Sequence, residues 1–342
     1  MTASWSDFIG NRRIHDWFAT AIRRQRFAGS FLLVGPTGVG KRTVANLLSR
    51  TILCETNPAA DMNPCGTCEG CIQVAAGTHP DVVQVAKPDD KSTIPLDLLI
   101  GRPEVRMQEG FCRDIRLKPF RGNHKVAILH DADFLNEEGA NCLLKTLEEP
   151  PSNAVVLVIG TSEQKQLPTI RSRCQIVRFT PLSLPDATRL LRDVHEVQMS
   201  DEEITDAVEV SAGDMHVALR LLTGEGANEF RQSLVSQLSA ASPDPIAIKR
   251  IITTRVEDAG KDASKRRGAM RDVFSMAVQY YRQQLRHSAA QSGVHPDTLA
   301  RLDRSVRALR EVDRSANQSS LIECYAADIC LATTGDRGSI GS

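Results

Sequence analysis

The chain has 342 residues, of which 41% are hydrophobic and 25% charged, and its formal net charge is zero with a pI of about 7.1. This composition is typical of a globular protein of roughly two or three domains, and it argues against an autonomous nucleic-acid binder, which would carry a basic excess. No apolar run approaches the roughly 20 residues of a membrane span, and the N-terminus has no signal-peptide core, so we expect a cytoplasmic protein.

The first predicted strand, residues 30–34, leads into a glycine-rich loop. Residues 35–41 are GPTGVGK, the beginning of the pattern G-x-x-x-x-G-K-[ST], in which backbone N–H groups and the lysine hold phosphate. Arg42 stands where the pattern requires the hydroxyl that binds Mg²⁺, and Thr43 lies about 100° further round the helix. We expect a degenerate loop that can hold ATP and lacks a ligand for Mg²⁺. Its residues are Gly35, Pro36, Thr37, Gly38, Val39, Gly40, Lys41, Arg42 and Thr43.

Four of the nine cysteines follow this loop, as Cys54, Cys65, Cys68 and Cys71. The last three form two C-x2-C steps among small and polar residues, a spacing that suits tetrahedral ligation of Zn²⁺ by thiolates. The alternatives are four free thiols, or His79 as a rival ligand, although HPD before a strand is typical of a turn. We predict a structural zinc module over residues 54–71, whose four protein ligands leave no open position for catalysis.

Further strands are predicted at residues 81–86, 125–130, 154–159 and 175–179. The apolar runs at 125–130 and 154–159 are continuous, as expected for strands buried on both faces. Between them, Asn136 is expected to cap a helix that ends before Pro150 and Pro151. Strands that alternate with helices predict a parallel α/β sheet within residues 1–180.

After residue 180 the pattern is helical. We expect a small helical domain over residues 181–225, a linker at 224–226, and a second helical domain over residues 226–334. The tail at 335–342 is polar and glycine-rich, and we expect it to be disordered.

Besides the phosphate loop and the four-cysteine insertion, the sequence contains two further motifs, LLKTLEEPP at 143–151 and SRC at 172–174. Together they resemble the clamp-loader AAA+ subunits of bacterial DNA polymerase III, in particular the delta prime subunits, over most of residues 1–225. The resemblance implies an AAA+ P-loop domain, a helical lid at 181–225 and a helical collar at 226–334 that joins subunits. It also implies partners, namely gamma/tau and delta subunits, and through the complex a sliding clamp and primer-template DNA.

Three residues depart from the pattern of the family's ATPase members. The resemblance places His130 at the metal-binding aspartate, Asp131 at the activating glutamate, and His216 at a lid arginine that reaches nucleotide. Because Mg²⁺ prefers oxygen ligands, His130 is a poor substitute. Arg42, His130 and His216 each remove a contact that hydrolysis requires, so we expect little or no intrinsic ATPase activity.

The resemblance gives Arg173 a catalytic role, as an arginine finger inserted in trans into the ATP site of a neighbouring subunit. An ordinary surface arginine is the alternative for an isolated SRC motif, and Arg171 is not distinguished from surface charge. Thr161 falls at the family's water-sensing position and is interpreted as structural. Glu148 and Glu149 are expected to end a helix in a subunit interface, away from any catalytic centre.

Two other functions remain open. One is a catalytically active clamp-loader ATPase of the gamma/tau type, against which the three departures stand. The other is a zinc-dependent DNA-binding module, which the neutral pI and the closed four-cysteine pattern disfavour.

Overall fold

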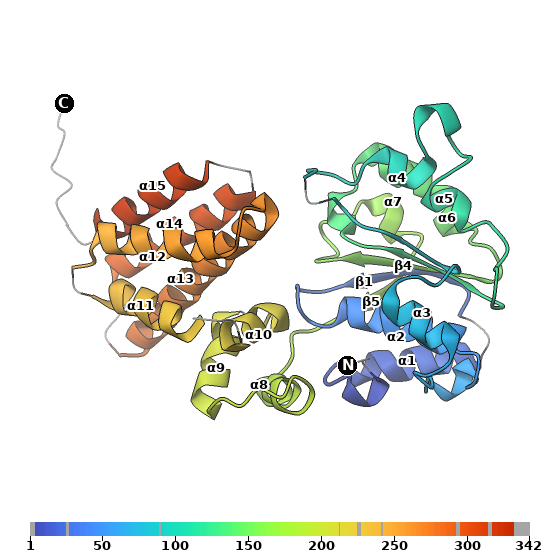
Figure 1. The fold of residues 1–342 in the computed structure, drawn as a ribbon, viewed down its shortest axis with the longest axis horizontal. Helices are drawn as coiled ribbons and strands as arrows, with labels where there is room; N and C mark the ends of the chain where they lie inside the picture. Colours follow the sequence, from blue (N-terminus) through green and yellow to red (C-terminus); the bar gives the residue numbers. More distant parts are fainter. Residues whose placement is uncertain are drawn as a thin grey trace. The chain divides into compact units, whose positions relative to one another are not determined.

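The structure is a computed structural model that describes residues 4–24, 27–88, 90–211, 213–223, 227–240, 242–291, 295–313 and 317–331. The chain forms two compact units, Met1–Leu190 and Leu191–Ser342, which are described separately (Figure 1). No helix among the described residues combines the length and the apolar composition of a membrane span.

The first unit is built on one parallel sheet of five strands, in the order β2-β3-β4-β1-β5. The strands are β1 (Gly29–Val34), β2 (Val82–Val85), β3 (Lys125–Leu129), β4 (Ala154–Gly160) and β5 (Gln175–Arg178). The predicted parallel sheet is confirmed, and each strand end lies within one residue of its predicted position. Apolar β-branched and aliphatic runs form the central strands because helices cover both faces of the sheet.

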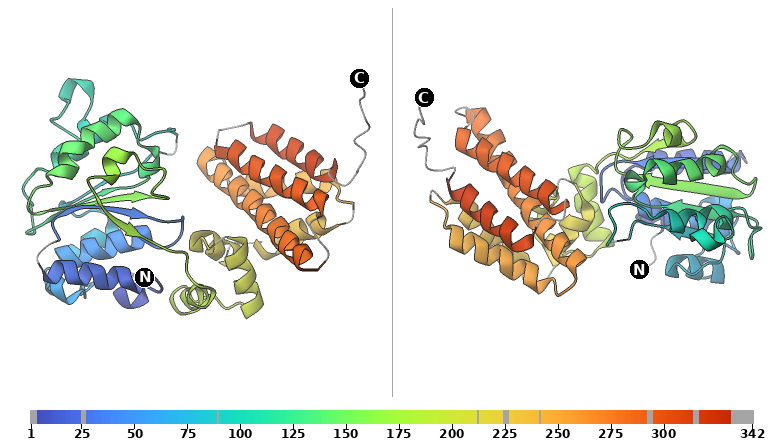
Figure 2. Two further views of the ribbon diagram at one scale, coloured as in Figure 1. Left: turned by 180° about the vertical axis from the view of Figure 1, so that it is seen from behind. Right: turned by 90° about the horizontal axis from the view of Figure 1, so that it is seen from above.

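Two layers of helices enclose this sheet, with α1 to α3 on one face and α4 to α7 on the other (Figures 1 and 2). Side chains of β1 alternate between the two cores: Phe31 and Leu33 pack with α1 and α2, and Leu32 packs on the opposite side with α4 to α7. The helices of this unit are η1 (Trp5–Asp7), α1 (Arg12–Arg23), α2 (Lys41–Leu53), η2 (Ala59–Asp61), α3 (Glu69–Ala76), α4 (Leu96–Ile100), η3 (Pro103–Val105), α5 (Phe111–Asp114), η4 (Ala132–Phe134), α6 (Glu137–Glu148), α7 (Pro168–Arg171) and α8 (Leu184–Arg189).

Helix α6 begins and ends where the sequence predicts. The side chain of Asn136 accepts a hydrogen bond from the backbone N–H of Gly139 at 2.8 Å and so caps the helix. The helix ends at Glu148, two residues before Pro150. Its carboxyl end thereby presents Glu148 to the segment that precedes β5.

Every regular element described in the second unit is a helix, as predicted. Its elements are η5 (Leu190–Val194), which continues from α8, α9 (Asp201–Val210), α10 (Met215–Thr223), α11 (Ala227–Ser239), α12 (Pro245–Asp258), α13 (Ala263–Gln291), α14 (Pro296–Asp313) and α15 (Gln318–Leu331). Phe274, Tyr281 and Tyr325 are among its largest buried side chains. The predicted linker at 224–226 and the predicted tail at 335–342 lie outside the described residues, and the division into lid and collar stays a prediction.

Candidate functional site

The phosphate loop connects β1 to α2 at the carboxyl end of the sheet's strands. Gly38 and Gly40 have φ values of 71° and 91°, a backbone conformation that glycine adopts readily, and Gly40 is the N-terminal cap of α2. Lys41 is 7% exposed, and its ammonium group donates to the carbonyl oxygens of Gly35 and Pro36. The loop therefore has the turn that the motif predicts, with its lysine folded onto the loop's own backbone.

Arg42 makes the contact that most distinguishes this loop. Its Nη2 lies 2.8 Å from Oδ1 of Asp131, although the two residues are far apart in sequence. Asp131 follows β3 and has a φ of 55°, and both side chains are partly exposed. Thr43 is exposed on the next position of the helix. Arg42, predicted to replace the metal-binding hydroxyl, is thus ion-paired with Asp131, the residue predicted to stand at the activating glutamate.

His130 lies next to this ion pair, directly after β3. Its Nε2 is 3.1 Å from Oε1 of Gln84 on β2, and its Nδ1 is buried without a hydrogen-bond partner in the described part of the chain. Burial lowers the pKa of His130 to about 4; the Arg42 cation adds to this effect and Asp131 opposes it. The imidazole is therefore neutral at pH 7, and it offers nitrogen where Mg²⁺ prefers oxygen.

The end of β4 is tied to the turn after β3 by a carboxylate that the sequence analysis did not single out. Backbone N of Thr161 lies 3.0 Å from both carboxylate oxygens of Asp133, and the Thr161 hydroxyl and the Gln166 amide also donate to this group. These bonds give Thr161 a structural role in the isolated chain. The one sequence signal for Asp133 is its position two residues after Asp131.

Arg173 lies between α7 and β5 and is held by the chain's own residues. Its Nε and Nη2 are each 2.5 Å from Oε1 of Glu148, and its Nη1 is 3.1 Å from the carbonyl oxygen of Thr169 and 3.0 Å from Oγ of Ser172. The side chain keeps 28% of its surface exposed. Arg173 is thus oriented by the end of α6.

His216 is the second residue of α10 and belongs to the other unit. Its backbone N–H donates to Oδ1 of Asp214 at 3.0 Å, which stabilises the first turn of the helix. The expected position of its side chain near nucleotide stays a prediction.

The four predicted cysteines come together around the end of α2 and the start of α3. Sγ atoms of Cys54, Cys65, Cys68 and Cys71 all lie within 4.8 Å of one another. Four thiolates at about 2.3 Å from one tetrahedral ion would be about 3.8 Å apart, so a small closure brings these atoms to coordination distance. The cluster could hold a metal ion.

The surroundings of the cluster act in opposite directions on the pKa values of its thiols. Hydrogen bonding from the backbone N–H of Cys68 to Sγ of Cys65, at 3.3 Å, lowers the pKa of Cys65 to about 5. Burial raises the pKa of Cys71 to about 12. A Cβ at Gly70 would lie 2.5 Å from the carbonyl oxygen of Leu53, so only glycine lets α3 approach the end of α2 this closely.

His79 is a turn residue. Its Nδ1 accepts a hydrogen bond of 3.0 Å from the backbone N of Asp81, and its side chain is buried. This agrees with the predicted turn before β2.

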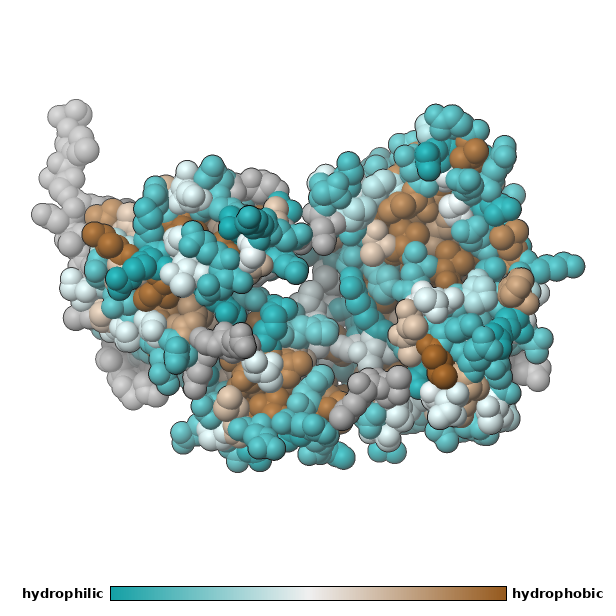
Figure 3. All heavy atoms as spheres, viewed as in Figure 1, coloured by the Kyte–Doolittle hydropathy of each residue, from teal (hydrophilic) through white to brown (hydrophobic). Residues whose placement is uncertain are grey.

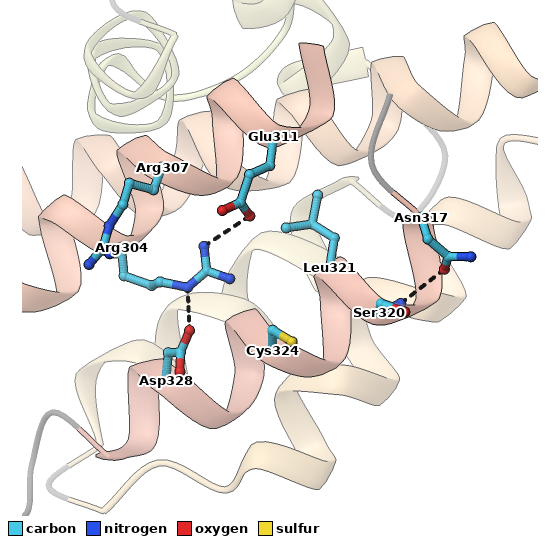
Figure 4. A pocket seen from close by; sticks show the side chains of 8 residues that line it. All are labelled: Arg304, Arg307, Glu311, Asn317, Ser320, Leu321, Cys324 and Asp328. Carbon is cyan, nitrogen blue, oxygen red and sulfur yellow. Dashed lines mark hydrogen bonds and ion pairs between the residues drawn. The ribbon is translucent and has the colours of Figure 1, made fainter. Parts of the chain in front are cut away.

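The second unit contains a depression of about 340 Å³ between α14 and α15 (Figure 4). Arg304 lines it and lies 2.6 Å from Asp328 and 3.4 Å from Glu311. The buried cation is therefore neutralised by two carboxylates, and the depression offers no evident anion site.

The family described as "DNA polymerase III, delta subunit" matches residues 10–183, which is half of the chain. The chain belongs to this family. The family match covers the sheet, the phosphate loop, the cysteine cluster and Arg173. It confirms the resemblance to DNA polymerase III clamp-loader subunits.

Relatives in this family group are of two kinds. DNA polymerase III subunit delta' of Pseudomonas aeruginosa is 34% identical over 229 residues, which are 64% of this chain and 65% of that protein. Subunit delta' of Escherichia coli is 32% identical over 214 residues, 63% and 60% of the two chains. Subunit tau of Escherichia coli is 26% identical over 248 residues, 72% of this chain and 35% of tau. The matches thus span less than two thirds of these relatives.

Among solved structures, the chain is similar to a DNA polymerase III gamma subunit-related protein from Thermotoga maritima. It is 16% identical, the superposition covers 93% of this chain and 99% of that chain, and the TM-score is 0.48.

Proposed function

We propose that the chain is a delta prime-like subunit of a DNA polymerase III clamp loader. It does not hydrolyse ATP itself, and it supplies Arg173 in trans to the ATP site of a neighbouring gamma/tau subunit. With delta it completes a hetero-oligomer that loads a sliding clamp on primer-template DNA. Family membership and the higher identity to two delta' subunits than to tau support this assignment.

The observation that carries the trans role is the position of Arg173 relative to the chain's own phosphate loop. Gln175 of β5 pairs with Phe31 of β1, and Gly35 comes four residues after Phe31. Arg173 therefore precedes the amino end of the β1–β5 ladder, whereas the phosphate loop follows its carboxyl end. At about 3.3 Å per residue the two are roughly 20 Å apart, further than an arginine side chain extends. A catalytic role for Arg173 thus requires the nucleotide of another molecule.

The ion pair between Arg42 and Asp131 supports the absence of hydrolysis. Phosphoryl transfer depends on a metal ion, a positioned water and charge stabilisation. Here the metal-binding hydroxyl is replaced by a cation, and this cation neutralises Asp131. Beside this pair, His130 is neutral and offers nitrogen in place of the oxygen ligand that Mg²⁺ prefers.

ATP hydrolysis by the purified, zinc-loaded chain alone tests this first part, with Lys41→Ala as the control for contaminating enzymes. We expect no hydrolysis above the level of Lys41→Ala. Activity that this substitution abolishes would instead identify an active ATPase of the gamma/tau type.

The second part is tested in the complex assembled with gamma/tau and delta subunits. Arg173→Ala is expected to leave assembly intact and to lower turnover at the neighbouring ATP site by roughly 10³-fold or more. Arg178→Ala is the matched control, because Arg178 is an exposed arginine of the same unit and pairs with Glu163 at 2.6 Å. An unchanged rate for Arg173→Ala in an intact complex would remove the finger assignment.

We assign the metal of the cysteine cluster as a structural zinc ion held by Cys54, Cys65, Cys68 and Cys71. Ligand type and the mutual distances of the sulfur atoms support this choice. Metal binding there is coupled to folding, so extraction of zinc with a thiol-specific reagent should lower the unfolding temperature of the first unit. An unchanged temperature would contradict the assignment. We further assign residues 181–225 as the lid and 226–334 as the collar that holds the subunits together.

A further inference from the structure

The loop between α5 and β3 presents an unusually exposed aromatic side chain on a fixed backbone. Phe120 is 84% exposed, the largest value among the large apolar side chains of the described residues. The carboxylate of Asp81, which is fully buried, accepts hydrogen bonds from the backbone N–H groups of Phe120, Arg121 and Gly122 at 2.5, 2.8 and 3.1 Å. The backbone that carries the ring is thus fixed, so less backbone freedom is lost when Phe120 contacts a partner.

A depression of about 670 Å³ lies beside this loop. Its lining residues are Gly77, His79, Pro80, Val82, Val83, Gln84, Asp114, Leu117 and Lys125. Asp81, which anchors Phe120, stands in the chain between two of these residues. Leu117 is 42% exposed at the edge of the depression.

Helix α3, whose C-terminal cap Gly77 lines the depression, carries a further exposed apolar side chain. Ile72 is 55% exposed and lies one turn after Glu69, whose carboxylate binds Arg121 of the Phe120 loop. Figure 3 shows apolar side chains interrupting the hydrophilic surface over α3. We call Ile72, Leu117, Phe120 and the depression the Phe120 surface.

The outer edge of the sheet borders the Phe120 surface. Strand β2 is the first strand in the sheet order and pairs only with β3. The carbonyl oxygens of Asp81 and Val85 accept from β3, so the intervening backbone groups of Gln84 point away from it. Among the described residues, no hydrogen bond is formed by the backbone of Gln84. An extended chain could therefore add a strand here.

The charged side chains near the Phe120 surface indicate which kind of partner chain could bind there. Arg121 pairs with Glu55 and Glu69, and Lys125 is close to Asp81, but Arg116 and Lys118 make no ion pair in the described part of the protein. These two exposed cations flank Leu117. A nucleic acid would stack its bases on the aromatic ring of Phe120, but this mode of binding does not involve aliphatic side chains such as Ile72 and Leu117. Aliphatic side chains beside unpaired cations favour an acidic protein segment.

We infer that the Phe120 surface, together with Arg116, Lys118 and the outer edge of β2, binds an extended acidic segment of a partner protein. The segment lies beside Gln84 as an additional strand, inserts an apolar side chain into the depression, and directs carboxylates to Arg116 and Lys118. Neither the phosphate loop nor Arg173 takes part, so this interaction is independent of the proposed function.

The test uses the full-length, zinc-loaded chain and a fluorescein-labelled peptide of ten residues that alternates aspartate and valine around a central leucine. Alternation places the carboxylates on one face of an added strand. The comparison probes are the same peptide with lysine in place of aspartate, and an oligothymidylate of ten nucleotides. Fluorescence anisotropy measures the affinity of each probe.

We expect the acidic peptide to bind at least about tenfold more tightly than the lysine peptide. Phe120→Ser and Lys118→Glu should each weaken it by about tenfold, while the exposed controls Ile246→Ser and Arg102→Glu should leave it unchanged. Hydrogen exchange of the Gln84 amide should slow in the complex, which an association through side chains alone would not produce.

Any of three results with the peptides would overturn the inference: equal affinities for the two peptides, an affinity unaffected by both surface variants, or no protection of Gln84. Tighter binding of the oligothymidylate than of the acidic peptide would overturn it as well, and would assign the surface to single-stranded nucleic acid.

Discussion

Replacement of Asp81 by asparagine is the most informative perturbation of the first unit. The carboxylate is fully buried and lies 3.9 Å from Nζ of Lys125, whose side chain is 6% exposed. Burial by itself raises the pKa of Asp81, but the three backbone N–H donors of residues 120–122 and the Lys125 cation more than offset this and hold it below its usual value. The group is therefore charged in the folded protein, and its stabilising effect is lost only as the pH falls through and below the usual range of an aspartate.

Asp81→Asn removes the charge and places an amide nitrogen among donors that need an acceptor. Lys125 becomes a buried cation without its counter-ion, and loss of one partner of a buried pair costs about 3–5 kcal/mol. We expect the unfolding free energy to fall by about that amount, a large part of the 5–15 kcal/mol typical of a domain.

Urea unfolding followed by tryptophan emission reports on the unfolding of the first unit, because both tryptophans, Trp5 and Trp17, belong to it. The exposed Asp61 provides the control, since Asp61→Asn should change stability by no more than about 0.5 kcal/mol. A loss below about 1 kcal/mol for Asp81→Asn would refute the reasoning. Adding Lys125→Met to Asp81→Asn should recover part of the loss if the unpaired cation dominates it.

Three further predictions concern the site and its supports. His130→Gln should make the first unit less sensitive to acid: the folded pKa of about 4 lies below the ordinary 6.5, so the unfolded chain takes up the proton first and stability falls as the pH drops from 6.5 toward 4. At pH 5 the variant should lose about 1 kcal/mol less than the parent in urea unfolding, after allowance for partial exposure of the ring; equal losses would contradict this. Gly70→Ala should cost about 1–3 kcal/mol in the same assay, because its Cβ would overlap the carbonyl oxygen of Leu53, and a neutral effect would show that α3 can shift freely. Glu148→Gln should cost no more than about 1 kcal/mol, since its pair with Arg173 is partly exposed, whereas a loss above about 2 kcal/mol would mean that Arg173 is too firmly held for exchange with a partner.

The strands and the ends of α6 could be predicted from the sequence because they depend on local patterns. Continuous apolar runs identified β3 and β4, and Asn136 with Pro150 marked the limits of the helix between them. The cysteine cluster was predicted for the same reason, since its last three members are close in the chain.

Contacts between distant segments could not be predicted. The resemblance placed Arg42 and Asp131 at one nucleotide site, but their spacing in the sequence did not indicate that they form an ion pair, because the order of the strands in the sheet brings them together. The pairing of Glu148 with Arg173 depends on the same tertiary arrangement. The sequence predicted Asp81 only as the first residue of a strand. Its carboxylate also anchors the loop at residues 120–122, whose backbone N–H groups donate to it, and this contact depends on the tertiary structure.

The position of Lys41 has a consequence for any phosphate ligand. Its ammonium donates to two carbonyl acceptors, those of Gly35 and Pro36, so a phosphate ligand competes with both for the donors of the lysine. Hydrogen bonds to a charged group contribute about 1.5–3 kcal/mol each, so an anion that takes over these donors must replace that contribution. Association at this loop is therefore a competition with the backbone, which disfavours a single phosphate more strongly than a chain of several. The affinity of the loop for a phosphate ligand should therefore rise with the negative charge of that ligand.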